Sequence, residues 1–216
     1  MNGAASGLIE ATKNAPGSGA GWASIPHGGG SWFKYGGGGI GGFGSLCGVP
    51  NGCCAFLNLA GVYTAALGEK VLGYYSETSF PTSAMCDAWQ GAGPEPIPDE
   101  EVLAHTVALS PLCHISISKW CDAAGVSLTD PSPSGTSYKQ DRCGKVCADM
   151  AAFTAELVNG STYAYTIPED TALCRGCHGG GGPDSAQNGK MDCAHCHTGE
   201  AVIVGSQHAN GQHNPN

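Results

Sequence analysis

Toward the end of the printed sequence, the chain carries two Cys-x-x-Cys pairs, each followed at once by a histidine. The first, CRGCH, spans residues 174–178, and the second, CAHCH, spans residues 193–197. Both lie in residues 166–216, which hold four of the twelve cysteines and five of the eight histidines but few large apolar side chains. Such a segment buries too little apolar surface to offset the entropy that it loses on folding. Its structure therefore depends on a bound cofactor, a bound metal or the rest of the chain.

Two kinds of bound group fit this spacing. The pattern Cys-x2-Cys-x15-Cys-x2-Cys is within the range of a four-cysteine zinc ribbon. A zinc ribbon has no use for a histidine after each pair, whereas haem c does, because that histidine ligates the iron of the haem that the two cysteines attach. We therefore favour two haems c per chain, with a zinc-ribbon module as the alternative. The predicted residues are the thioether cysteines Cys174, Cys177, Cys193 and Cys196 and the proximal histidines His178 and His197.

The ligand on the far side of each iron decides what such haems do. An iron with an open position binds small molecules and supports chemistry, whereas an iron held by two histidines is closed and transfers electrons. Each remaining histidine is also compatible with an ordinary place in the core or on the surface, so the residues alone leave the distal ligand open. The six remaining histidines are His27, His105, His114, His195, His208 and His213.

The charge balance narrows the class of partner. Charged residues make up 12% of the chain, and eighteen acidic residues stand against nine Lys and Arg. Nucleic acid and anionic lipid both attract clustered basic residues, so neither is an expected partner. The longest apolar stretch, residues 53–67, is too short to span a bilayer. A basic protein is the expected partner, because opposite charge accelerates encounter.

The cysteine content bears on the compartment. Twelve cysteines in 216 residues indicate an oxidising compartment, bound metal or an attached cofactor. The first fifteen residues lack the basic stretch and apolar core of a secretory leader. We expect a periplasmic or extracellular location, with any leader outside this numbering.

Hydrophobic periodicity and capping residues predict a mainly α fold. For one expected helix, residues 113–125, the alternation of Ile and Ser leaves a strand as the alternative. We expect residues 1–165 to form a helical domain with a Gly-rich loop at 17–48, and residues 166–216 to form a mostly irregular haem-binding segment. The expected helices cover residues 2–14, 52–68, 99–110, 113–125 and 137–158.

Four segments stand out when taken together: GGGIGGFGSLCGVPNG (37–52), SPLCHISISKWC (110–121), DRCGKVCADMAAFTAELVN (141–159) and GKMDCAHCH (189–197). They resemble the split-Soret cytochrome c family, and the resemblance runs in order from about residue 20 to residue 197. The family implies a mainly helical, periplasmic electron carrier with two haems per chain, stacked at one end of a homodimer. It also implies that both irons are bis-histidine and that some ligation crosses between subunits. On this basis His114 is our first candidate for a distal ligand and His27 the second.

The same resemblance implies a possible iron–sulfur centre of the [2Fe-2S] type. Family relatives usually carry a cysteine near the start of the first helix, and the segment NGAASGLIEA has none. Cys53 and Cys54 are additional cysteines that could take that role. The alternative is that these cysteines are disulfides or buried thiols. The matching cysteines are Cys47, Cys113, Cys121 and Cys143.

The resulting hypothesis is a dihaem c-type cytochrome that relays electrons between redox proteins, among them other cytochromes, outside the cytoplasm. It needs no acid, base or nucleophile, so we predict an electron carrier and not an enzyme. One alternative is a subunit of an extracellular cytochrome filament, since cross-subunit ligation also permits head-to-tail assembly. A second is a reductase that acts on nitrite, hydroxylamine or peroxide at an open iron.

Overall fold

The computed structural model describes residues 2–27, 32–82, 104–133, 135–179, 182 and 189–193. Helices dominate these residues, which confirms the mainly α fold class. No helix among them is long and apolar enough to cross a membrane. The elements are α1 (Asn2–Lys13), η1 (Ala20–Ser24), η3 (Lys34–Gly36), α2 (Gly48–Leu59), α3 (Ala65–Glu77), β1 (Ser79–Phe80), β2 (Thr106–Val107), α5 (Cys113–Ala124), α6 (Tyr138–Val158) and α7 (Glu169–His178).

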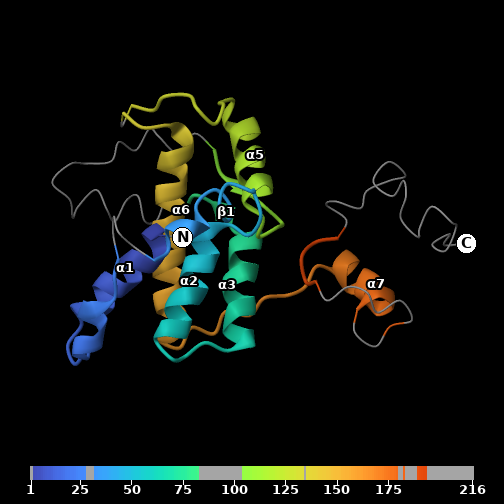
Figure 1. Cartoon of the computed structure of the whole chain (residues 1–216). Helices are drawn as coiled ribbons and strands as arrows, with labels where there is room; N and C mark the ends of the chain where they lie inside the picture. Colours follow the sequence, from blue (N-terminus) through green and yellow to red (C-terminus); the bar gives the residue numbers. More distant parts are fainter. Residues whose placement is uncertain are drawn as a thin grey trace, which may run out of the picture. The chain divides into compact units, whose positions relative to one another are not determined.

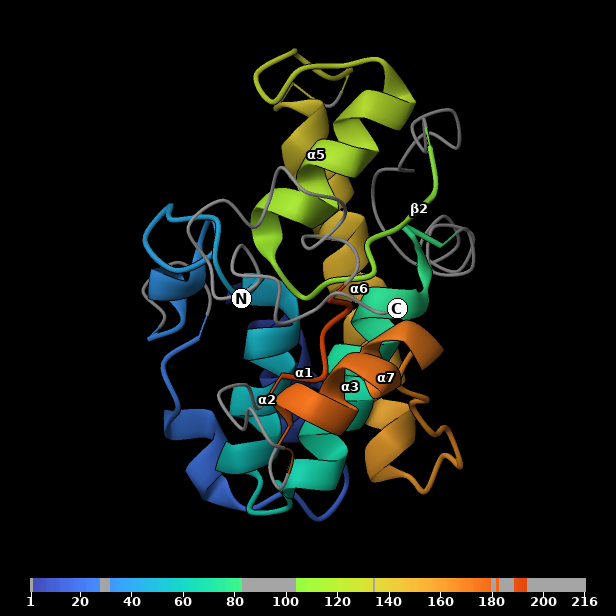
Figure 2. The ribbon, with the colours of Figure 1, turned by 90° about the vertical axis from the view of Figure 1, so that its right-hand side faces the viewer.

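The chain divides into two compact units, residues 1–165 and residues 166–216. In the first unit, α6 is the longest helix (Figures 1 and 2). Its N-terminal half lies beside α5, and its C-terminal half lies beside α1, α2 and α3. The second unit contains α7.

The core of the first unit forms where α1, α2 and α3 pack against α6. Val146 and Met150 of α6 are fully buried, and Phe153 stacks on Tyr74 of α3 with ring centroids 3.7 Å apart. The structure confirms the helix predicted for residues 137–158, and its buried apolar residues recur at steps of three and four residues: Val146, Met150, Phe153 and Leu157. Ser137 begins this helix with a capping box, which satisfies two backbone N–H groups that the first turn leaves free.

The helix predicted for residues 52–68 is wrong in its bounds. The structure has two helices here, because α2 ends at Leu59 and α3 begins at Ala65 after a turn with Gly61 at a φ of 71°. Gly68 lies inside α3 and does not terminate a helix. A Cβ at Gly68 would lie 2.6 Å from the Tyr63 hydroxyl, so glycine at this position allows Tyr63 to pack closely against α3.

The helix predicted for residues 99–110 is wrong over residues 104–110, and residues 99–103 lie outside the described chain. β2 pairs antiparallel with β1 at this point, with Phe80 opposite Thr106. His105, expected on that helix, instead precedes β2, and its Nδ1 donates to the Pro81 carbonyl. Strand pairing has overridden the local helical pattern.

For residues 113–125 the structure decides between the two alternatives in favour of a helix. α5 buries Ile115, Ile117 and Trp120, and it ends at Gly125 in the left-handed conformation. Within residues 166–216, α7 forms over the first Cys-x-x-Cys-His motif. Pro168 precedes α7, and two acidic residues occupy its first turn, where they stabilise the helix dipole.

Candidate functional site

The first Cys/His motif occupies the last turn and a half of α7. Cys174 and His178 are four residues apart, so they lie on one face of the helix. Cys174 is exposed, and His178 is half-buried. The backbone of Cys177 is helical, but its side chain is not among those that the structure describes. A cysteine and its histidine on one helical face suit the attachment of a haem on that face.

The second motif meets α7 at its first cysteine. The Cys193 N–H donates to the Thr171 hydroxyl at 3.3 Å, and Thr171 is fully buried. Burial and the neighbouring Cys174 thiol raise the pKa of Cys193. The first cysteines of the two motifs are therefore in contact. Cys196 and His197 lie outside the described residues, as do His195, His208 and His213.

His114 projects from the first turn of α5 beside the Gly-rich loop. Its Nδ1 donates to the Gly44 carbonyl at 3.0 Å, and the side chain is exposed. This bond fixes the tautomer, so the lone pair of a neutral ring is on Nε2. Gly44 has a φ of 69°, and a Cβ there would lie 3.0 Å from the Cβ of His114. The loop therefore has to carry glycine at the point where it holds this histidine.

His27 is engaged at both ring nitrogens. Its Nδ1 donates to the Ile25 carbonyl at 2.6 Å, and its Nε2 donates to a Glu10 carboxylate oxygen at 2.8 Å. These two hydrogen bonds raise the pKa of His27, because both favour the protonated ring. His27 has to leave Glu10, and lose the proton on Nε2, before it can ligate an iron, whereas its Nδ1 can keep the bond to the Ile25 carbonyl.

Cys47 and Cys113 are brought together by a short antiparallel bridge between Leu46 and Leu112. The Cys47 N–H donates to the Pro111 carbonyl at 2.8 Å, and the Cys113 N–H donates to the Ser45 carbonyl at 2.7 Å. Cys47 occupies the N-cap position of α2, and Cys113 begins α5. The two thiols therefore meet where two helices start.

The pKa of the Cys47 thiol is lowered to about 6. The largest cause is a hydrogen bond from Cys113, and Tyr75, the Val49 N–H and the charge of Arg142 act in the same direction. The helix N-terminus favours a thiolate at this position for the same reason that it favours any anion. The pKa of Cys113 is raised, since it holds the proton that the pair shares.

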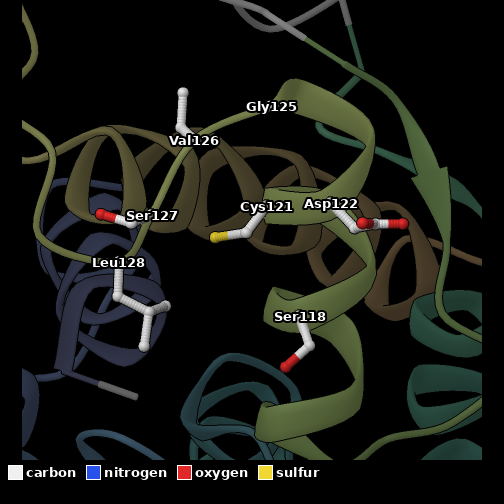
Figure 3. A pocket seen from close by; sticks show the side chains of 7 residues that line it. All are labelled: Ser118, Cys121, Asp122, Gly125, Val126, Ser127 and Leu128. Atoms are coloured by element: carbon white, nitrogen blue, oxygen red, sulfur yellow. The ribbon is translucent and has the colours of Figure 1, made fainter.

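Cys143 and Cys121 complete the set of four predicted cysteines, which we call the polar thiol group (Cys47, Cys113, Cys121 and Cys143). Burial raises the pKa of both Cys143 and Cys121, and the charge of Arg142 opposes this rise at each. Cys121 faces an open pocket of about 570 Å³ at the end of α5, where its Sγ points toward the segment that follows the helix (Figure 3). Within the described part of the chain, no three ligating side chains converge on a point where a single metal ion could bind.

Arg142 is a candidate functional residue that was not evident from the sequence. It is 4% exposed, and its Nη2 donates to the Ser116 hydroxyl at 2.7 Å. Ser116 also accepts from the Tyr75 hydroxyl at 2.9 Å. The one signal in the sequence was that Arg142 is next to Cys143, but an arginine is ordinarily exposed.

Three other cysteines form a separate set, which we call the apolar thiol group (Cys53, Cys54 and Cys147). Burial raises the pKa of Cys53 to about 12 and that of Cys54 and Cys147 to about 11. The Cys53 thiol donates to the Met150 carbonyl at 3.6 Å. All nine cysteines whose side chains the structure describes are free thiols, which argues against disulfides among them.

Comparison with known proteins gives a consistent result. No protein-family model matches the chain. The split-Soret cytochrome c of Desulfovibrio desulfuricans (strain ATCC 27774 / DSM 6949 / MB) is 30% identical over 175 residues, which cover 76% of this chain and 58% of that protein. The chain thus matches less than two thirds of the length of this curated relative.

The fold agrees with the sequence relationship. A solved structure of the split-Soret cytochrome c from Desulfovibrio desulfuricans ATCC 27774, described as having a novel iron centre, superimposes with a TM-score of 0.68. The match is 25% identical and covers 92% of this chain and 81% of that one. The chain belongs to the split-Soret cytochrome c family, a family of haem proteins.

Proposed function

We propose that this chain is a dihaem c-type cytochrome that relays electrons between redox partners outside the cytoplasm. The observation that carries the proposal is the doubled Cys-x-x-Cys-His motif at residues 174–178 and 193–197. Bound haem c supplies an iron that cycles between the ferric and ferrous states. The chain's part is to attach each haem by two thioethers and to hold its iron from one side with His178 or His197.

Two features support haem attachment to these residues. The common face of Cys174 and His178 on α7 presents a thiol and an imidazole in the same direction. The contact between Cys174 and Cys193 brings the two motifs close enough for two haems to lie near each other. Close haems exchange electrons rapidly, which is what a relay requires.

For the distal side we propose His114. Its Nδ1 is fixed by the Gly44 carbonyl, so Nε2 is free to ligate, and the exposed side chain can reach a haem outside its own helix. His27 is the second candidate, and its hydrogen bond to Glu10 occupies Nε2 and opposes ligation. A second histidine closes the iron and favours electron transfer over small-molecule chemistry.

Exposed aromatic side chains support assembly of several copies with ligation across subunits. Trp32, Tyr35 and Phe43 are 64%, 55% and 90% exposed in or beside the Gly-rich loop that holds His114. Such a set favours burial against another surface. We propose a homodimer, and a filament is the alternative that the same aromatic surface also permits. Sedimentation velocity separates them, because a closed dimer has one size and a filament has many.

A second cofactor site is proposed at the polar thiol group. The iron centre named for the solved relative belongs to that protein, and we propose a [2Fe-2S] cluster here. Each iron of such a cluster takes two thiolates, and all four sulfur atoms surround one compact core. Cys113 and Cys121 are about 12 Å apart along the axis of α5, so this helix has to open between them before the cluster can bind. Cys47 and Cys113 already form one pair, and Cys121 with Cys143 would form the other. The buried charge of Arg142 also fits an anionic occupant.

Intact mass and the reduced absorption spectrum test the haem proposal. The wild-type protein should exceed its polypeptide mass by about 1.2 kDa, corresponding to two haems, and it should show a c-type α-band. The double variant Cys174→Ala/Cys177→Ala should lose about 0.6 kDa, or one haem, while Cys54→Ala, outside both motifs, should lose none. A colourless wild-type protein that binds zinc would contradict the proposal and support the zinc ribbon.

Carbon monoxide tests whether the irons are closed. The reduced wild-type protein should show no spectral change on exposure to carbon monoxide, because both distal positions are occupied. His114→Ala should open one iron and produce a carbon monoxide spectrum, while His105→Ala should not. Carbon monoxide binding to the wild-type protein would favour the open-iron reductase.

A further inference from the structure

Residues 37–45, which we call the glycine coil, have a backbone conformation that polypeptides rarely adopt. Five consecutive residues, 38–42, have positive φ values between 56° and 84°. Glycine tolerates this left-handed region, but Ile40 is β-branched and still has a φ of 56°. Backbone hydrogen bonds hold the coil, among them one from the Gly44 N–H to the Gly38 carbonyl at 2.9 Å. Strain of this kind persists where the surroundings enforce one conformation, and it is concentrated at functional sites.

The glycine coil meets His114 at Gly44. The backbone N–H and the Nδ1–H of His114 both donate to the Gly44 carbonyl, at 3.1 Å and 3.0 Å. A Cβ at Gly44 would lie 3.0 Å from the Cβ of His114, so the coil and the histidine are in contact at this point. Because Nδ1 is occupied, Nε2 is the nitrogen of the neutral ring that can ligate an iron.

Phe43 comes immediately before this contact and projects into solvent. Its side chain is 90% exposed, which is the highest value among the large apolar side chains that the structure describes. The Cα atoms of Phe43 and Gly44 are about 3.8 Å apart, so the side chains of Phe43 and His114 start from neighbouring positions. The Phe43 N–H donates to the carbonyl of the strained Ile40 at 3.2 Å. An ordered coil therefore presents an exposed phenyl ring beside an imidazole.

A porphyrin is the group of a haem protein that suits both side chains. Its iron takes an imidazole nitrogen, and its flat face is apolar. The porphyrin ring is wider than the separation between the two positions, so a haem ligated at Nε2 of His114 extends over Phe43. The glycines on both sides of Phe43 add no side chain between it and the ring, and a Cβ at Gly42 would have nothing within 4 Å. The arrangement thus leaves room for a flat ligand.

We propose that Phe43 packs on the face of the haem whose iron His114 ligates, and that the glycine coil positions this contact. The role of Phe43 rests on the ligation by His114 proposed above, and it holds whichever copy of the chain carries that haem. Phe43 excludes water from this side of the haem. The ferric state carries one positive charge more than the ferrous state, so exclusion of water disfavours it and raises the reduction potential.

Three variants of the haem-loaded protein test this contact. Phe43→Ala removes the ring and Phe43→Leu keeps an apolar side chain, while Leu128→Ala truncates an exposed apolar side chain beyond the far end of α5. At one haem, Phe43→Ala should lower the ratio of ferrous to ferric iron about threefold at a fixed ambient potential, which is about 28 mV at 59 mV per tenfold change. Phe43→Leu should keep most of the potential, and Leu128→Ala should not shift it. Helical content and haem content should stay the same, because Phe43 is exposed.

Proton NMR of the reduced wild-type protein gives a direct second readout. Ferrous haem with two histidine ligands is diamagnetic, and the ring current of a porphyrin shifts the resonances of protons that lie over its face. The ring protons of Phe43, assigned by their loss in Phe43→Leu, should therefore be shifted upfield. Ring protons at their ordinary positions would show that no porphyrin lies on Phe43, and would overturn its role.

The outcomes separate the role of Phe43 from the ligation on which it rests. If His114→Ala leaves both irons closed to carbon monoxide, the proposed ligation fails and the role of Phe43 fails with it. If His114→Ala opens an iron but Phe43→Ala shifts neither potential more than Leu128→Ala does, the role of Phe43 alone is overturned. A lower sedimentation coefficient in Phe43→Ala with unchanged potentials would mean that Phe43 covers a second copy of the chain and not a haem, which also overturns it.

Discussion

Cys143 and Cys147 are one turn apart on the same helix, and their surroundings differ. Cys143 belongs to the polar thiol group, with the Arg142 guanidinium next to it. Cys147 belongs to the apolar thiol group, where its Sγ would lie 3.2 Å from a Cβ at Gly3 of α1. The difference shows that the groups surrounding a thiol determine whether it can serve as a metal ligand. Residue type and spacing in the sequence are not sufficient.

The two groups also differ in whether the surroundings of a cysteine stabilise the negative charge of its thiolate. Cys47 meets a helix N-terminus, a hydrogen-bonding thiol and a buried cation, so its pKa is lowered. Cys53 lies in the apolar core with a carbonyl group as its acceptor, so its pKa is raised. Within the polar thiol group, Cys47 is therefore the thiol whose surroundings favour negative charge, while Cys53 serves as part of the core.

The largest expected effect is on the pH dependence of stability. Because the pKa of Cys47 is about 6 in the folded protein and ordinarily 9.0, the iron-depleted protein should gain stability from pH 6 to pH 9, by up to about 4 kcal/mol. The apolar thiol group acts in the opposite direction. Its pKa values are raised, so its contribution is fully present below pH 9 and is lost between about pH 9 and pH 12.

Urea unfolding of the iron-depleted protein at a series of pH values measures these slopes. Cys47→Ala should flatten the rise between pH 6 and pH 9 and leave the fall at higher pH in place. Cys147→Ala should flatten part of the fall and leave the rise. If the free energy of unfolding of Cys47→Ala rose as steeply between pH 6 and pH 9 as that of the wild type, another group would be titrating in this range.

The next largest effect comes from the core around the apolar thiol group. Met150 is fully buried, and its carbonyl accepts hydrogen bonds from Cys53 and Thr154. Met150→Ala should lower the free energy of unfolding by about 3 kcal/mol through the cavity that it leaves. The potential of the iron centre should not change, because this side chain is not part of the polar thiol group.

Met191→Ala is the matched control for that substitution. Met191 is 36% exposed, so the same truncation should change the free energy of unfolding by less than about 0.5 kcal/mol. Chemical unfolding of both variants gives the comparison. A shift of the iron-centre potential in Met150→Ala would mean that the two thiol groups are linked through α6.

Local signals in the sequence were sufficient to predict part of this architecture. The helical pattern of residues 137–158 is local, and the structure confirms a helix there as α6. The doubled Cys/His motif is local as well, which is why the amino-acid pattern alone predicts the haem-binding residues. These features need only neighbours within a few residues.

The features that the sequence did not reveal depend on contacts between distant residues. Cys47 and Cys113 meet because Leu46 pairs with Leu112, far away in the sequence. The separate helix α3 and strand β2 likewise depend on Tyr63 packing at Gly68 and on pairing with Phe80. Arg142 was missed because its burial is a property of the packed core and leaves no periodic trace.

A smaller effect is expected from the loop that holds both Cys113 and His114. Gly39 has a φ of 73°, and a Cβ there would lie 2.6 Å from the backbone of Gly44 and 2.8 Å from the Cβ of Cys113. Gly39→Ala should cost about 2 kcal/mol or more and reduce the iron content, because the loop has to move away from α5.

Gly42→Ala controls for the backbone alone. Gly42 has a φ of 84° with nothing within 4 Å of a built Cβ, so this variant carries the left-handed strain of about 1–2 kcal/mol without the clash. Thermal unfolding and iron analysis of the two variants distinguish the effect of backbone strain, which both variants share, from movement of the loop away from α5, which only Gly39→Ala should cause. Equal iron loss in both would mean that the contact between Gly39 and Cys113 does not matter.

The smallest expected effect tests whether α6 supports both thiol groups alike. Ser137 caps this helix, and its hydroxyl accepts from the Gln140 N–H at 3.3 Å. Ser137→Ala should lower stability by about 1 kcal/mol. Cys143 and Cys147 lie in successive turns of α6. We expect the rate of amide hydrogen exchange to rise by a similar factor in these two turns.

Thr64→Ala removes the corresponding cap from α3, where the hydroxyl accepts from the Leu67 N–H at 3.1 Å. It should cost a similar amount, but α3 carries no cysteine, so the alkylation rates of both thiol groups should stay the same. In Ser137→Ala, α6 opens more often, so the alkylation rates of Cys143 and Cys147 should rise together. Acceleration at Cys143 alone would mean that the N-terminal half of α6 opens separately, and the contrast between the two groups would then be partly one of local stability.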